Sequence, residues 1–118
     1  MIIAKTLLAE QKTPSAVLAC DLEAIGAAER PRYSSLTHQL KAAVLQQREL
    51  PDGLAWELDE KKLSFMEAAE WITFERRCCP FITLQLESTG NHTGYWVNLQ
   101  GPAGVKAFLV AEFGPVTR

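Results

Sequence analysis

The feature that most constrains the fold is a helix-forming segment that ends at two adjacent cysteines and a proline. Residues 63–79 contain no glycine or proline and are rich in glutamate and alanine, which favours a helix. Ser64 and Glu67 have the spacing of a capping box, and Asp59 is an alternative N-cap. Pro80 has no amide hydrogen and disfavours helical geometry in the residue before it. The sequence therefore predicts a helix that ends at about the cysteine pair.

Apolar residues occur on two sides of this predicted helix. One side carries Phe65, Ala69, Ile72 and Cys79, and the roughly opposite side carries Leu63, Trp71, Phe74 and Cys78. A helix of this kind is central in its fold, or is covered on one side by a partner subunit. Glu75 lies between the two sides, three residues before Cys78 and four before Cys79, so its carboxylate can lie beside both sulfurs.

Three hypotheses account for the cysteine pair. In the first, the thiolates bind a soft ion such as Zn(II), Cu(I), Hg(II) or a trivalent arsenical, with Cys20 or Glu75 as the third ligand. In the second, the pair is redox active, through a vicinal disulfide or a bridge to Cys20. In the third, the cysteines pack as small buried apolar residues. A helix C-terminus opposes thiolate formation, which counts against a cysteine nucleophile more than against a metal ligand, because metal binding itself deprotonates a thiol.

The segment from Glu75 to Phe81, Glu-Arg-Arg-Cys-Cys-Pro-Phe, resembles the motif of a family of small uncharacterised bacterial proteins. The resemblance spans residues 17–113 and includes Ala19-Cys20-Asp21, Leu50-Pro51-Asp52-Gly53 and Gly101-Pro102-Ala103-Gly104. Members share an acidic residue, two arbitrary residues, Cys-Cys-Pro-Phe, an alternating strand and a helix that Gly-Pro begins. The resemblance implies the architecture and favours a special role for Glu75, Cys78 and Cys79. Cys20 matches an early cysteine of the family, so the three thiols are considered together. The resemblance implies no particular activity.

Length and composition place limits on the function. A chain of 118 residues predicts a single α+β domain over residues 1–118, with residues 1–14 as an N-terminal extension of uncertain structure. A net charge of −2 gives no reason to expect binding to nucleic acid or to an anionic membrane. Three cysteines and no secretory signal suit a reducing cytoplasm. Hydrolase motifs are absent from the sequence, so an enzyme is not supported and no catalytic residue is assigned.

The remaining segments predict an α+β two-layer sandwich in the order β-α-β-α-β-β-α, with a mixed sheet and a C-terminal hairpin and helix. Before the cysteine helix, the sequence predicts a strand over 15–20, a short helical turn that Asp21 caps, a helix over 31–47 and a strand over 53–59. After it come strands over 81–88 and 95–100, joined by a loop over 89–94, and a helix between Gly101-Pro102 and Gly114-Pro115. His38 lies off the apolar stripe of its helix, which indicates an exposed side chain.

The leading functional prediction is a thiol-based protein that binds or senses a soft metal or metalloid, such as zinc or mercury, through Cys78 and Cys79, with Cys20 or Glu75 as a further ligand. One alternative is a structural or protein-interaction module, a homodimer in which a partner covers Leu63, Trp71 and Phe74 while the cysteines only pack. The other alternative is a thiol redox protein. The three sulfurs meet only if the end of the first predicted strand lies near Phe81.

Overall fold

The computed structural model describes residues 18–90 and 94–114. Its elements are η1 (Leu22–Ala24), α2 (Arg30–Ala43), β1 (Val44–Leu50), β2 (Gly53–Leu58), α3 (Phe65–Cys78), β3 (Thr83–Ser88), β4 (Tyr95–Gln100) and α4 (Val105–Phe113). The α+β prediction is confirmed. The predicted extension over residues 1–14, residues 15–17 of the predicted first strand and residues 91–93 of the hairpin loop lie outside the described residues.

The four strands form one sheet in the order β1-β2-β4-β3, and every neighbouring pair is antiparallel. The prediction of a mixed sheet was therefore wrong. Residues 18–20, the described part of the predicted first strand, have no strand structure, so this segment does not supply the strand–helix–strand crossover that parallel pairing needs. Two hairpins, β1–β2 and β3–β4, lie side by side through the pairing of β2 with β4.

Strand β1 replaces the end of the helix that the sequence predicted over residues 31–47. Helix α2 ends at Ala43, and Val44 already has extended geometry, with φ −67° and ψ 120°. The Pro51-Asp52 turn brings Leu50 opposite Gly53 and gives residues 44–50 a strand partner. Strand pairing thus outweighs the helix propensity of residues 45–47. After η1 the observed order is α-β-β-α-β-β-α, where the sequence predicted β-α-β-α-β-β-α.

Helix α3 begins and ends where local sequence signals place it. The Ser64 hydroxyl accepts a 3.0 Å hydrogen bond from the Glu67 amide, and the Glu67 carboxylate accepts a 2.9 Å bond from the Ser64 amide. This is the predicted capping box. The helix ends at Cys78, and Cys79 is its C-cap.

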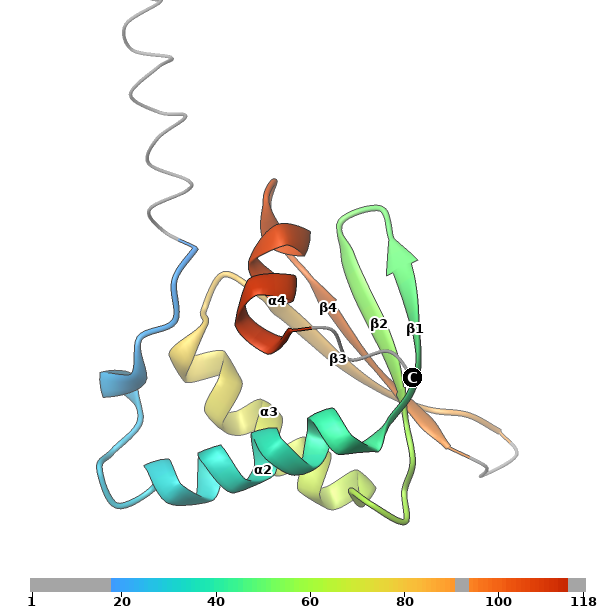
Figure 1. Ribbon diagram of the computed structural model, residues 1–118, viewed down its shortest axis with the longest axis horizontal. Coiled ribbons are helices and arrows are strands. Elements are labelled where there is room, and N and C mark those ends of the chain that lie inside the picture. Colours follow the sequence, from blue (N-terminus) through green and yellow to red (C-terminus); the bar gives the residue numbers. More distant parts are fainter. Residues whose placement is uncertain (1–17, 91–93, 115–118) are drawn as a thin grey trace, which may run out of the picture.

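Helices α2, α3 and α4 lie together on one face of the sheet, as a second layer (Figure 1). Between the layers the ring of Phe113 packs edge-on against Trp56, at 5.3 Å between ring centroids, and against Trp71, at 6.1 Å. Leu63, Trp71 and Phe74 are buried by the chain itself, so they do not need the partner subunit that the interaction-module hypothesis placed over them. A homodimer stays a prediction, but these three side chains cannot form its interface because they are already buried.

Candidate cysteine site

The structure brings the three cysteines together at the C-terminal end of α3. The Sγ atoms of Cys20, Cys78 and Cys79 all lie within 4.8 Å of one another. Cys20 and Cys79 form a disulfide, while Cys78 is a free thiol whose sulfur lies 3.9 Å from that of Cys79. The three sulfurs therefore meet, which the sequence made conditional on the position of the first predicted strand. Cys20 nevertheless lies in an irregular segment and does not end a strand.

The segment that carries Cys20 is hydrogen-bonded to the end of α3. The amide of Asp21 donates a 2.9 Å hydrogen bond to the carbonyl oxygen of Cys78, one of the carbonyls that a helix C-terminus leaves without a partner. The Asp21 carboxylate accepts a 3.1 Å bond from the Glu23 amide and caps η1, as predicted. Asp21 therefore fixes its neighbour Cys20 against the cysteine pair.

A second attachment joins η1 to the same helix. Nη2 of Arg77 donates 3.1 Å hydrogen bonds to the carbonyl oxygen of Ala24 and to Oε1 of Glu29. Both side chains of the Arg77–Glu29 pair are exposed to solvent, which screens their attraction, so the pair contributes little to stability. Its effect is to hold the chain that follows Cys20 beside the last turn of α3.

Glu75 lies in the core and is not a member of the cluster that the sulfurs of Cys20, Cys78 and Cys79 form. It is the one charged residue that is buried among the described residues, with no exposed surface. Its Oε1 accepts a 2.7 Å hydrogen bond from the Tyr33 hydroxyl, and its Oε2 has no hydrogen-bond partner within the described chain. The pKa of Glu75 is raised to about 7, and burial is the main cause. The hydrogen bond from Tyr33 lowers this pKa in part, and the charge of Glu112 adds a smaller rise.

The prediction that Glu75 can serve as a third ligand therefore gains no support from this geometry. No histidine, aspartate or glutamate of the described residues joins the group that the three sulfurs form. Glu75 acts on the site through its charge, because it raises the pKa of Cys78 in addition to the larger rise from burial. Hydrogen bonds from Tyr33 and from the Asp21 amide lower that pKa in part. The net effect keeps Cys78 protonated, which makes it a poor nucleophile in the absence of a metal.

Tyr33 is the residue of this site that sequence reasoning missed. It lies in α2 and is buried, with its ring edge-on to Phe74 at 6.0 Å between centroids. A buried tyrosine hydroxyl needs a polar partner, and this need is the only sequence signal for a contact between Tyr33 and Glu75, which are 42 residues apart.

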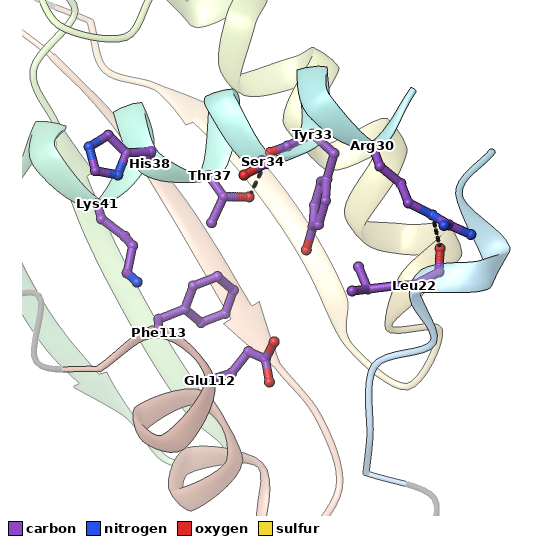
Figure 2. A pocket seen from close by; sticks show the side chains of 9 residues that line it. All are labelled: Leu22, Arg30, Tyr33, Ser34, Thr37, His38, Lys41, Glu112 and Phe113. Atoms are coloured by element: carbon purple, nitrogen blue, oxygen red, sulfur yellow. Dashed lines mark hydrogen bonds between the residues drawn. The ribbon is translucent and has the colours of Figure 1, made fainter. Parts of the chain in front are cut away.

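A cavity of about 380 Å³ lies between α2 and α4, and Tyr33 is one of the residues that line it. Figure 2 shows its two walls, with His38 and Lys41 on α2 and Glu112 and Phe113 on α4. The remaining lining residues are Leu22, Arg30, Tyr33, Ser34 and Thr37. His38 is exposed, as predicted, and is not a member of the sulfur group.

No protein-family model, curated protein or solved structure matches this chain. The resemblance to the Glu-x-x-Cys-Cys-Pro-Phe family therefore stays a prediction. No helix in residues 18–90 and 94–114 has the length and hydrophobicity that a membrane span requires.

Proposed function

We propose that this protein binds a soft metal or metalloid ion through Cys20, Cys78 and Cys79, as a sensor, carrier or sequestering protein. The observation that carries the proposal is the separation of the three sulfurs, all within 4.8 Å. Two sulfurs that share one ion lie at most about 4.6 Å apart, because a metal–thiolate bond is about 2.3 Å long. The Cys78–Cys79 separation of 3.9 Å already meets this condition.

The electrostatics of the site favour an ion over thiol nucleophilic chemistry. Burial and Glu75 raise the pKa of Cys78, so its thiolate is scarce without a metal. A bound soft cation supplies the positive charge that stabilises the thiolates. In the reduced protein the three thiols are available as ligands, and the Cys20–Cys79 disulfide corresponds to an oxidised form that has lost two of them. Function as a metal-binding protein then fits a reducing compartment such as the cytoplasm.

A thiol redox protein is the second candidate, and the Cys20–Cys79 disulfide is the observation that favours it. Cys78 lies close enough to Cys79 to take part in thiol–disulfide exchange. The raised pKa of Cys78 counts against this candidate, since the attacking species is the thiolate.

Thiol and metal stoichiometry separates the two candidates. The reduced protein is titrated with Zn(II), Hg(II) and arsenite under native mass spectrometry, and free thiols are counted with and without denaturant. The metal proposal predicts one ion per chain and loss of all three thiols. Cys20→Ser should weaken binding, while the matched control Ala19→Ser, one residue away and exposed, should not. Absence of any bound ion, together with a reversible two-electron couple, would support the redox candidate instead.

A further inference from the structure

We infer that the ion for which the cysteine cluster is built is a trivalent metalloid such as As(III), held by three sulfurs without a fourth ligand. This inference rests on the proposed function and specifies its ligand. It follows from the number of donors, the charge of the complex and the burial of the site.

In the reduced protein the number of donors is three, because reduction of the Cys20–Cys79 disulfide gives two thiols beside that of Cys78. Among the described residues the cluster contains Cys20, Cys78 and Cys79 and no histidine, aspartate or glutamate. The nearest carboxylate on the same helix, Glu75, is engaged by the Tyr33 hydroxyl at 2.7 Å. Structural zinc sites almost always have four protein ligands. Trivalent arsenic, in contrast, completes its coordination with three sulfurs and carries a lone pair on the fourth side.

The charge of the complex also distinguishes the ions. Three thiolates around a divalent ion leave one net negative charge, whereas three thiolates around As(III) leave none. Cys78 and Cys79 have no exposed surface, and a buried charge without a partner is strongly unfavourable. A neutral complex avoids that cost.

The surroundings of the sulfurs offer little compensation for a negative complex beyond the hydrogen bonds from Tyr33 and the Asp21 amide, which favour the Cys78 thiolate in part. The C-terminal end of α3 contributes the negative end of the helix dipole. Arg76 and Arg77 in the last turn are both exposed, and Arg77 is already hydrogen-bonded to Ala24 and Glu29. Glu75 is the buried ionisable group closest in sequence to the pair, and its charge has the wrong sign.

A linear two-coordinate ion fits the adjacent pair poorly. With metal–sulfur bonds of about 2.3 Å, a linear arrangement needs sulfurs about 4.6 Å apart. The sulfurs of Cys78 and Cys79 are 3.9 Å apart, which corresponds to an S–ion–S angle of about 115°. A linear ion between Cys20 and either of the pair would leave the third sulfur unused. A three-coordinate centre uses all three sulfurs at bent angles.

The binding reaction starts from the reduced protein, in which an external thiol reductant has supplied two electrons and two protons to the Cys20–Cys79 disulfide, and from there it needs no oxidant. Arsenous acid, As(OH)₃, exchanges its three hydroxyl groups for the sulfurs of three protonated cysteines. Three As–O bonds and three S–H bonds break, three As–S bonds form, and three water molecules leave. Arsenic stays trivalent throughout. Cys20 is the partly exposed member of the cluster, so the reaction begins from its side.

The test compares arsenite, Zn(II) and Cd(II) on the reduced full-length protein. Native mass spectrometry counts bound ions, and X-ray absorption at the arsenic edge counts sulfur and oxygen neighbours. We expect one arsenic per chain with three sulfur neighbours and no oxygen, and we expect arsenite to displace zinc. Cys20→Ser should replace one sulfur neighbour by oxygen, while Ala19→Ser should keep three.

Each other outcome has a defined meaning. Tight binding of Zn(II) or Cd(II) that arsenite does not displace overturns the trivalent assignment and leaves the proposed function in place. Two sulfur neighbours with one oxygen in the wild-type protein also overturns it, because one cysteine then lies outside the site. Failure of all three ions to bind overturns the assignment, and failure of Hg(II) as well overturns the proposed function. Because these arms use the wild-type chain, the result does not depend on whether a cysteine variant folds.

Discussion

The hydroxyl of Tyr33 donates a 2.7 Å hydrogen bond to Oε1 of Glu75, a fully buried carboxyl group whose other oxygen has no partner in the described chain. This contact joins α2 to the last turns of α3, next to the cysteine cluster. It places an ionisable group in the core, where its protonation state affects stability.

Glu75 should make the protein less stable as the pH rises. Its pKa is raised from 4.5 in an unperturbed glutamate to about 7 in the fold, with burial as the main cause. Between these values the folded protein holds a proton that the unfolded chain has released, so the free energy of unfolding falls as the pH rises from about 4.5 to about 7. The loss is up to about 3 kcal/mol and is complete above pH 7. Urea unfolding at a series of pH values measures it.

The matched variants for this prediction are Glu75→Gln and Glu60→Gln. Glu75→Gln keeps the shape of the side chain and should remove most of the pH dependence in this range, so that the variant exceeds the wild type in stability at pH 8. Glu60→Gln, which removes an exposed carboxylate, should follow the wild-type profile. An unchanged profile in Glu75→Gln would show that the core carboxyl group does not titrate there.

Tyr33→Phe should destabilise the fold by about 1–3 kcal/mol, because it leaves a buried acceptor without its donor. It should also raise the pKa of Glu75 further, since the lost hydrogen bond favours the ionised form. Tyr95→Phe is the control, because it removes another buried hydroxyl, which donates to the carbonyl of Leu63 at 2.7 Å. Thermal unfolding should show a loss in both variants, whereas only Tyr33→Phe should shift the pH profile.

Asp21→Ala should weaken ion binding more than it weakens the fold. The carboxylate of Asp21 caps η1 and so positions Cys20, but it lies at the surface. Loss of an N-cap side chain typically lowers the stability of a protein by about 1 kcal/mol. Asp21→Asn keeps an acceptor oxygen at the same place and should bind as the wild type does. Equal affinities of the Ala and Asn variants for arsenite in competition assays would contradict this role.

Gly53→Ala should destabilise the sheet strongly. A Cβ at residue 53 would overlap the carbonyl oxygen of Leu99 in the neighbouring strand, which is backbone and has little freedom to move. Overpacking of this kind costs about 1–3 kcal/mol or more. Gly90→Ala, where a Cβ meets nothing within 4 Å, is the control, and its unfolding midpoint should stay close to that of the wild type.

The parts of the fold that the sequence predicted well are those that local signals determine. Ser64, Glu67 and Pro80 lie within α3 or next to its ends in sequence, and they fix those two ends. Alternation of apolar residues likewise located β2, β3 and β4. Strand β1 was missed because its residues suit a helix, and only pairing with β2 makes them extended.

The candidate site was predictable in its residues but not in its contacts. The spacing of Glu75, Cys78 and Cys79 along one helix identified the region. The meeting of Cys20 with the pair depends on the Asp21–Cys78 hydrogen bond between segments far apart in sequence. The Tyr33–Glu75 contact depends on how α2 crosses α3, which no local pattern specifies.

Cys20 and Cys79 are 59 residues apart, and the chain between them contains η1, α2, β1, β2 and all of α3. Any bond that joins the two sulfurs, directly or through a shared ion, closes this loop and restricts the unfolded chain. A loop of this length corresponds to about 4 kcal/mol in the chain-entropy account of cross-links. The cysteine cluster is therefore also a cross-link that encloses half of the protein. When the cluster is bonded or holds an ion, the whole domain should resist proteolysis better than when its thiols are free.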